Sequence, residues 1–410
     1  MSPQQTFVIV GAGLAGAKAA EALRAEGFDG RVVLIGDEAD RPYDRPPLSK
    51  GYLLGNTERE KIYVHSEQWY ADHDVDLRLG IQVTEIDRAA RQVHTSQGDT
   101  VRYDKLLLAT GSSPRRLDVR GADLSGVHYL RRVADSDALR SAFAAAQRVA
   151  VIGGGWIGLE TAAAARAADC KVTLIERESL PLLGVLGPEV AQTYAALHRA
   201  NGVEMRMGAE VIEIIGTADE VAGVRLGDGD VIPADAVVVG VGIVPNVGLA
   251  EAAGLPLDNG VVVDEHLATT DTDVFAAGDV ANAYYPVLGT RLRLEHWSAA
   301  LNQGPVAAAN MMGRSTAYDK VPYFFSDQYD SGMEYSGYAP RGGYDEVVFR
   351  GDVDSGEFIA FWCKGATVRA GMNVNIWDVN DAVEALVRSG APIDPSKLAD
   401  PDVPLTELTT

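Results

Sequence analysis

Two short glycine series, about 140 residues apart, are the features of this sequence best suited to chemistry. They share the spacing G-x-G-x-x-G: Gly11, Gly13 and Gly16 in the first, and Gly153, Gly155 and Gly158 in the second. In such a series the first glycine makes a tight turn and the second lets the backbone approach a pyrophosphate. The third allows a helix to pack on a strand, and the pyrophosphate lies at the positive helix N-terminus. One series alone is weak evidence, because it can also mark a packing turn without a ligand.

The elements around each series strengthen the prediction. Both series lie in the order strand, turn, helix, strand, acid, which is a βαβ unit of the dinucleotide-binding type. The predicted strands are residues 7–10 and 31–35 around the first series, and residues 149–152 and 171–175 around the second, which also has a predicted helix at 159–168. Two such units in one chain favour two dinucleotides that exchange a hydride.

An acidic residue follows the second strand of each unit. Asp37 is placed to accept hydrogen bonds from one ribose, and Glu176 from another. A carboxylate there binds a free 2′-hydroxyl and repels a 2′-phosphate, so Glu176 favours NADH over NADPH. Arg177 follows directly and could soften that preference.

Composition narrows the class of protein. The chain has 410 residues, 47% of them hydrophobic, and a formal net charge of −22. This charge argues against nucleic acid or an anionic membrane as the main partner. We find no targeting signal and no apolar run long enough to span a membrane. Cys170 and Cys363 form no CxxC pair, so we expect no disulfide framework, no metal site and a reducing, cytoplasmic location.

The remaining pattern predicts an α/β fold: two Rossmann-like dinucleotide-binding domains and a C-terminal α+β domain. Further strands are expected at 84–104, 106–111, 204–235, 236–242, 346–350, 357–364 and 367–372, with helices starting near Trp297 and at 379–389. The predicted domains are residues 1–115 and 245–320 for one cofactor, 116–244 for the other, and 321–410 at the end.

Four further segments carry a family resemblance. They are the run RPYDRPPLSK at 41–50, Ala109-Thr110-Gly111, the stretch 270–279 that ends in Gly278-Asp279, and Glu295-His296-Trp297. Together they resemble the oxygenase-coupled NADH–ferredoxin reductases, the group of putidaredoxin reductase, rubredoxin reductase and the biphenyl dioxygenase reductases, with a glutathione-reductase-like fold. The resemblance covers nearly the whole chain.

This resemblance implies FAD and NADH as cofactors, with hydride transfer to flavin N5. Electrons would then pass one at a time to a small iron–sulfur ferredoxin that serves a cytochrome P450 or a ring-hydroxylating oxygenase. A monomer or a homodimer is expected. The ferredoxin, its cluster type and the terminal oxygenase cannot be named from the sequence.

The resemblance also assigns residues. The FAD contacts would be Gly11, Gly13, Leu14, Ala15, Gly16, Asp37, Arg45, Lys50, Val83, Ala109, Thr110, Gly111, Arg131, Asp279, Glu295, His296 and Trp297. The NAD contacts would be Gly153, Gly155, Trp156, Ile157, Gly158, Glu160, Glu176, Val241 and Gly242. Lys50 and Glu160 would be the catalytic residues, with Glu160 at the nicotinamide end and in reach of Lys50.

These residues also have simpler structural interpretations. Lys50 could be a solvated loop lysine, and Glu160 could act only on the dipole of its helix. Trp297 and the aromatic residues 323–325 could belong to the core. His296 is expected to have no catalytic role, because hydride transfer needs no general base.

Two alternatives to the reductase function stay open. One is an NADH oxidase or quinone reductase; the other is a redox-sensing interaction protein resembling apoptosis-inducing factor. Disulfide and peroxide reductases are disfavoured, because the predicted FAD-binding segments contain no cysteine. For a ferredoxin partner, Arg293, Arg314 and Lys320 are a candidate basic patch in an otherwise acidic chain.

Overall fold

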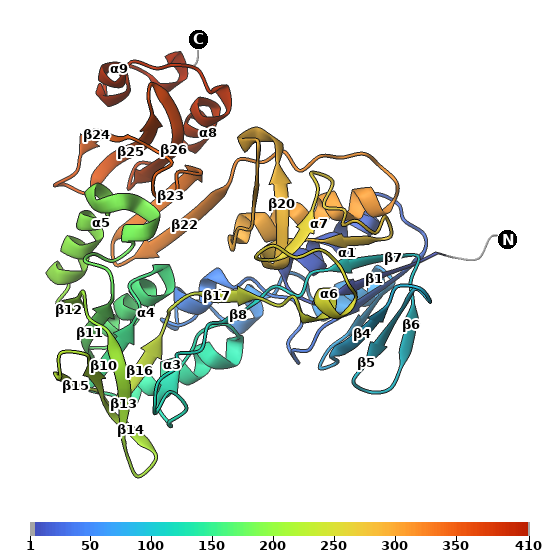
Figure 1. The fold of residues 1–410 in the computed structure, drawn as a ribbon, viewed down its shortest axis with the longest axis horizontal. Helices are drawn as coiled ribbons and strands as arrows, with labels where there is room; N and C mark the ends of the chain where they lie inside the picture. Colours follow the sequence, from blue (N-terminus) through green and yellow to red (C-terminus); the bar gives the residue numbers. More distant parts are fainter. Residues whose placement is uncertain (1–4, 409–410) are drawn as a thin grey trace. The chain divides into compact units, whose positions relative to one another are not determined.

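The computed structural model of the protein describes residues 5–408. These residues form two compact units, each built from three separate stretches of the chain. The first unit comprises the residues up to Asp44, Arg59–Ser113 and Val244–Pro322, and the second comprises Arg45–Glu58, Pro114–Ile243 and the residues from Tyr323 onward. Figure 1 shows the elements of both units, coloured along the chain.

A five-stranded parallel sheet forms the centre of the first unit, in the order β19-β7-β1-β2-β3. The strands are β1 (Thr6–Val10), β2 (Arg31–Ile35), β3 (Val75–Arg78), β7 (Lys105–Leu108) and β19 (Val274–Ala276). Helices α1 (Leu14–Ala25) and α7 (Trp297–Met311) pack closely together. A Cβ added at Gly304 of α7 would lie 2.4 Å from the Ala15 carbonyl oxygen of α1, so glycine permits this contact.

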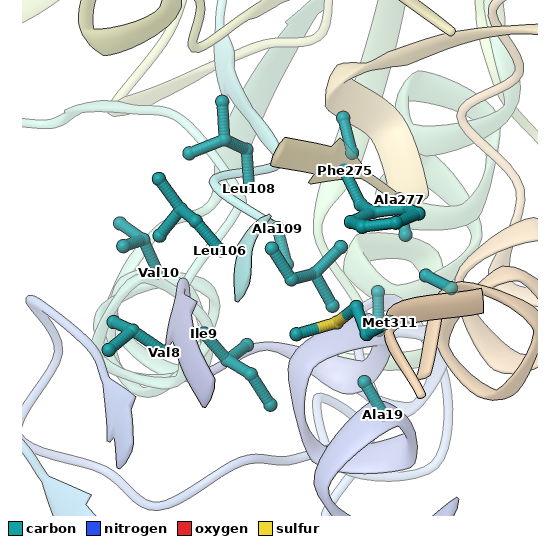
Figure 2. Packing of buried hydrophobic residues seen from close by; sticks show 14 of the residues in the cluster. Val8, Ile9, Val10, Ala19, Leu106, Leu108, Ala109, Phe275, Ala277 and Met311 are labelled. Carbon is teal, nitrogen blue, oxygen red and sulfur yellow. The ribbon is translucent and has the colours of Figure 1, made fainter. Parts of the chain in front are cut away.

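The core of the first unit lies beside β1, β7 and β19. Figure 2 shows the cluster, in which Ile9 of β1, Phe275 of β19 and Met311 of α7 are each at most 4% exposed. Burying a side chain of this size contributes about 1.5–3 kcal/mol relative to leaving it in water. The core therefore fixes the carboxyl ends of β1 and β7, where Gly11 and Ala109 follow.

Smaller elements complete the first unit. They are the antiparallel strands β4 (Val83–Asp87), β5 (Gln92–Thr95) and β6 (Thr100–Arg102), the strands β18 (Val261–Val263), β20 (Ala281–Tyr285) and β21 (Thr290–Leu292), and the helices α2 (Glu67–Asp72) and α6 (Gly248–Ala252). Short 3₁₀ turns lie at Arg59–Ile62, Gly278–Val280 and Pro286–Leu288. Strands β8 (Ser112–Pro114) and β17 (Ile243–Pro245) pair where the chain passes from one unit to the other.

The second unit repeats the parallel architecture, with the strand order β12-β11-β10-β16-β9. The strands are β9 (Val127–His128), β10 (Arg148–Ile152), β11 (Lys171–Glu176), β12 (Glu204–Met207) and β16 (Ala236–Val239). An antiparallel sheet of β13 (Val211–Thr217), β14 (Glu220–Leu226) and β15 (Val231–Pro233) follows β12. The helices are α3 (Val133–Ala145), α4 (Trp156–Ala167) and α5 (Leu183–Ala200), and Pro46–Ser49 forms a 3₁₀ turn.

An antiparallel sheet with the order β22-β23-β26-β25-β24 occupies the C-terminal part of the second unit. Its strands are β22 (Tyr323–Gln328), β23 (Ser331–Gly337), β24 (Glu346–Asp352), β25 (Glu357–Lys364) and β26 (Thr367–Val374). Helices α8 (Asn380–Ser389) and α9 (Pro395–Ala399) and a 3₁₀ turn at Leu405–Glu407 follow. Trp362 of β25 is fully buried and donates from its indole nitrogen to the Leu186 carbonyl of α5, at 2.9 Å.

The predicted fold class is confirmed: two parallel Rossmann-like sheets and a C-terminal antiparallel sheet. Some bounds differ from the prediction. Helix α4 begins at Trp156 rather than at 159, because Gly155 is its N-cap residue and Gly158 lies inside the helix. Strand β7 ends at Leu108 and does not reach Gly111, whose φ of +63° lies outside the extended region. Within residues 5–408, no helix has the length and apolar character needed to cross a membrane.

Candidate dinucleotide sites and a buried ion pair

The first glycine series forms a tight turn between β1 and α1. Gly11 has a φ of +115°, and a Cβ there would lie 2.1 Å from the Ala109 carbonyl oxygen. A Cβ at Gly16 would lie 2.1 Å from the Gly11 carbonyl oxygen. These two positions therefore need glycine for the backbone itself. Gly13 differs, because no atom lies within 4 Å of a Cβ built there.

The second series repeats this geometry between β10 and α4. Gly153 has a φ of +104°, and its Cβ would lie 2.4 Å from the Gly240 carbonyl oxygen. A Cβ at Gly158 would lie 1.9 Å from the Gly153 carbonyl oxygen, whereas nothing lies within 4 Å of one at Gly155. Gly13 and Gly155 thus leave open space that the protein's own packing does not require.

Both helices that follow present an N-terminus suited to an anion. Gly13 and Gly155 are the N-cap residues, so no side chain caps the first amides, and neither first turn contains an acid. Unpaired amides and the helix dipole favour a phosphate group at such an end. Open space and donors together fit the pyrophosphate of a dinucleotide in each unit.

The acids after β2 and β11 differ in their contacts. Asp37 is exposed, and its neighbour Glu38 accepts a hydrogen bond from the Tyr43 hydroxyl at 2.6 Å. Glu176 accepts from the backbone nitrogens of Gly154, at 2.5 Å, and Glu178, at 2.9 Å. Each oxygen retains a second lone pair, so Glu176 can support the glycine turn and still accept from a ribose hydroxyl.

Some of the other predicted FAD contacts lie in the first unit, whereas Arg45, Lys50 and Arg131 belong to the second. The Thr110 hydroxyl donates to the Asn246 carbonyl at 2.9 Å, directly after β7. The Trp297 indole donates to the Asp44 carboxylate at 2.7 Å, at the start of α7. Burial lowers the pKa of His296 to about 4, while Asp279 opposes this shift. His296 is therefore neutral near pH 7.

The remaining predicted residues of the first unit are mostly backbone or core positions. Ala15, Val83 and Ala109 are buried, Leu14 and Gly111 are part-buried, and Glu295 forms an ion pair with Arg293 at 2.6 Å. The Arg293 side chain is only 8% exposed. The expectation that Arg293 belongs to a surface basic patch is therefore wrong. Arg314 is half exposed, but it is paired with Glu26.

The predicted NAD contacts in the second unit surround the second glycine turn. Val241 and Gly242 follow β16, and Gly242 has a φ of +98°. Ile157 is 40% exposed, unusually so for an isoleucine on the first turn of a buried helix. Trp156 instead packs against Phe324 and Tyr194, with ring centroids 5.2 and 5.4 Å away. Its indole thus joins α4 to α5 and β22.

Lys50 and Glu160 form a buried ion pair within the second unit. The Lys50 amine lies 2.7 Å from Glu160 Oε1, and the side chains are 15% and 3% exposed. The two proline residues of the turn Pro46–Ser49 fix the backbone before Lys50. The Ser136 hydroxyl anchors this turn by donating to the Leu48 carbonyl at 2.8 Å, and Arg45 donates to the Arg131 carbonyl.

Two serines that the sequence did not indicate also bind Glu160. Ser326 of β22 donates to Glu160 Oε1 at 2.6 Å, and Ser49 donates to Oε2. A buried carboxylate is costly unless its lone pairs are satisfied, and these donors supply that satisfaction. Serine is common and Ser326 lies 166 residues from Glu160, so no local pattern could have identified it.

The two cysteines are buried, unpaired thiols. Burial raises the pKa of Cys170 and raises that of Cys363 to about 11. Thiols with raised pKa values are poor nucleophiles near neutral pH. Across residues 5–408, no group of three or more His, Cys, Asp or Glu side chains is arranged to hold a metal.

Comparison with known protein families decides what these sites belong to. Residues 5–304 match the model of the pyridine nucleotide-disulphide oxidoreductases, and residues 323–409 match the reductase C-terminal domain. The chain belongs to the pyridine nucleotide-disulphide oxidoreductase family. The family relationship suggested by the sequence motifs is confirmed, and the chain is an oxidoreductase that uses FAD and NAD(H).

Individual members of the family match along almost their full length. The chain is 44% identical to the anthranilate 1,2-dioxygenase system ferredoxin–NAD(+) reductase component of Burkholderia cepacia, over 97% of this chain and 98% of that one. It is 42% identical to rhodocoxin reductase of Rhodococcus erythropolis, over 98% and 93%. The crystal structure of the covalent putidaredoxin reductase–putidaredoxin complex matches with a TM-score of 0.95 and 38% identity, covering 98% of both chains.

Proposed function

We propose that this oxidoreductase transfers electrons from NADH, through FAD, to a small iron–sulfur ferredoxin that serves an oxygenase. The supporting observation is the pair of equivalent glycine turns, one in each unit, with a buried lysine–carboxylate pair beside the second. The two relatives above are a ferredoxin–NAD(+) reductase component and a rhodocoxin reductase, and the solved neighbour is a covalent complex of putidaredoxin reductase with putidaredoxin.

The first unit would hold FAD. The amides at the start of α1 would bind the pyrophosphate, Asp37 the adenosine ribose, and Asp279 the ribityl chain. Trp297, held by Asp44, would lie against the flavin edge. When bound, FAD accepts a hydride from NADH and returns electrons singly. The protein contributes orientation and electrostatics.

The second unit would hold NADH. The amides at the start of α4 would bind its pyrophosphate, and Glu176 would accept from its adenosine ribose. That carboxylate repels a 2′-phosphate, so NADH is the preferred substrate over NADPH.

Lys50 and Glu160 would act at the nicotinamide end of the second site. Glu160 keeps the Lys50 ammonium in one place. The lysine therefore presents a positive charge whose position is fixed by the protein and not by surrounding water. A preorganised charge of this kind stabilises developing charge without reorganisation during the reaction. A cytoplasmic location is proposed together with this function.

Steady-state kinetics of the FAD-loaded protein test the proposal. With NADH, a [2Fe–2S] ferredoxin and cytochrome c as the final acceptor, we expect turnover that saturates with ferredoxin concentration. Oxygen or a quinone consuming NADH as fast without ferredoxin would support the oxidase alternative. Slow reduction followed by a long-lived reduced complex would support a redox sensor instead.

A further inference from the structure

Ser326 is the end of a hydrogen-bond chain that runs away from Glu160 through the second unit. Gln328, also on β22, donates from Nε2 to the Ser326 hydroxyl at 3.1 Å. On α5, the Nε2 atom of His198 lies 2.7 Å from the amide oxygen of Gln328. The Tyr329 hydroxyl lies 3.3 Å from His198 Nδ1. Glu160, Ser326, Gln328 and His198 are each at most 4% exposed.

The chemistry of each group sets the direction of this chain. The amide oxygen of Gln328 can only accept, so His198 Nε2 carries the hydrogen. Burial lowers the pKa of His198, which is therefore neutral near pH 7, and its Nδ1 accepts from Tyr329. Every member thus donates toward Glu160, which as a carboxylate can only accept.

A serine alone would orient Glu160 poorly, because a hydroxyl proton rotates freely between partners. Here the Gln328 amide occupies a lone pair of the Ser326 oxygen, so the Ser326 proton is left for Glu160. His198 in turn fixes which way the Gln328 amide faces. Aligned donors also polarise one another, which strengthens the last hydrogen bond of the chain.

We propose that Ser326, Gln328 and His198 are positioning residues that hold the Glu160 carboxylate against Lys50. This inference rests on the proposed function, since the held pair would lie at the nicotinamide end of the NADH site. It assigns the C-terminal sheet a part in hydride transfer, because β22 supplies both the serine and the glutamine. None of the three residues need touch a cofactor.

Ser326→Ala tests the inference, with Ser336→Ala as the matched control. Ser336 lies on the adjacent strand β23, is fully buried, and donates to Asn380 Oδ1 at 2.7 Å, away from Glu160. The first readout is the crystal structure of each FAD-loaded variant without NADH. We expect Glu160 to leave Lys50 in Ser326→Ala and to stay in Ser336→Ala.

The second readout is the limiting rate of flavin reduction by NADH in anaerobic stopped flow. Loss of a hydrogen bond to a charged group predicts a rate about tenfold lower in Ser326→Ala. Ser326→Thr, which keeps the hydroxyl, should restore most of it. His198→Leu, which leaves the Gln328 oxygen without its donor, should slow reduction less than Ser326→Ala does.

Two results would overturn the inference. One is an unmoved Glu160 in the Ser326→Ala structure; the other is equal reduction rates in the Ser326→Ala and Ser336→Ala proteins. Failure of the proposed function looks different, because the unmodified protein would then not be reduced by NADH, or would pass no electrons to ferredoxin.

Discussion

Gly13 and Gly155 occupy equivalent places in the two glycine turns, and their open surroundings make a paired prediction possible. Their φ angles of −89° and −78° suit any residue, so valine at either position should fold. Gly13→Val should yield protein with little bound FAD. Gly155→Val should retain FAD but bind NADH poorly.

Absorbance spectra and NADH titrations of the two purified variants measure this directly. The companion positions serve as the contrast: Gly16→Val and Gly158→Val should fail to fold, since their Cβ atoms would overlap a carbonyl oxygen. Normal flavin content in Gly13→Val would place the cofactor elsewhere.

A second prediction at the scale of single residues concerns Glu176. Glu176→Ala should lower kcat/KM for NADH and narrow its advantage over NADPH, because repulsion of the 2′-phosphate is lost along with a support of the Gly154 turn. Glu178→Ala is the control, since Glu178 is exposed and contacts Glu176 through its backbone nitrogen, which alanine keeps. An unmodified protein that used both nucleotides equally well would contradict the assignment.

The thiols give a third prediction. Raised pKa values keep Cys170 and Cys363 protonated at pH 8, whereas an unfolded chain has thiols with a pKa near 8.5. Iodoacetamide should therefore label the native protein slowly and the denatured protein quickly. Double replacement by alanine should leave NADH–ferredoxin turnover within about twofold. Loss of turnover with the fold intact would indicate thiol chemistry.

What the sequence predicts at this scale follows from how local each feature is. Gly11, Gly16, Gly153 and Gly158 are predictable, because a strand-to-helix turn needs glycine at fixed spacing and the structure shows the backbone contacts that require it. The partners of Glu160 are not predictable in this way. Ser49 stands in the run at 41–50, but nothing in that run marks it as a partner of Glu160, and Ser326 has no distinguishing pattern. Only the fold brings both serines near Glu160.

At the scale of elements, helix α5 contains a break that yields a prediction. Gly187 has φ 77° and ψ 170°, a region that only glycine enters readily, and Pro188 follows it. A Cβ at position 187 would also lie 2.0 Å from the Tyr344 hydroxyl. Gly187→Ala should lower the free energy of unfolding by about 1–3 kcal/mol.

Gly184→Ala is the matched control in the same helix. A Cβ at Gly184 meets nothing within 4 Å, so alanine should be neutral or stabilise by up to about 1 kcal/mol. Urea denaturation of both variants measures the difference. Equal stability of the two proteins would mean that the break in α5 is not a strained feature.

Elements were predictable where apolar residues form a continuous run. The strand Arg31–Ile35 and the strand Glu357–Lys364 agree with the predicted ranges residue for residue. Strand β23 was not predicted, because Ser331–Gly337 contains two glycines and two serines and shows no clean alternation. This segment forms a strand because it pairs with β22 on one side and with β26 on the other.

At the scale of the whole molecule, the grouping of segments was the hardest feature to predict. Residues Arg45–Glu58 belong to the second unit although they lie between stretches of the first. Contacts far along the chain hold them there, including the Tyr52 hydroxyl on Asp137 at 2.7 Å and Lys50 on Glu160. The family resemblance placed Glu160 in reach of Lys50, but no local sequence pattern pairs Tyr52 with Asp137 or assigns the whole segment to the second unit.

Net charge also acts at this scale, and it leads to a prediction about the electron acceptor. At a formal charge of −22, the protein as a whole repels an acidic ferredoxin, so docking needs local cations. Of these three cations, Arg293 has a side chain only 8% exposed and paired with Glu295, and Arg314 is paired with Glu26, whereas Lys320 is exposed. Lys320 directly precedes Val321-Pro322 and the aromatic start of β22. It is therefore the best single candidate for steering.

Lys320→Glu should lower the rate of ferredoxin-dependent cytochrome c reduction several-fold at low ionic strength. The rate should also depend less on salt concentration, because the variant has less electrostatic attraction to the ferredoxin for salt to screen. Reduction of ferricyanide needs no docking and should be unchanged. Arg102→Glu, an equal charge change at an exposed residue of β6, controls for net charge. If both variants slow cytochrome reduction equally, long-range charge alone governs association. If ferricyanide reduction falls as well, Lys320 supports the flavin site, and the acceptor docks on a different part of the protein.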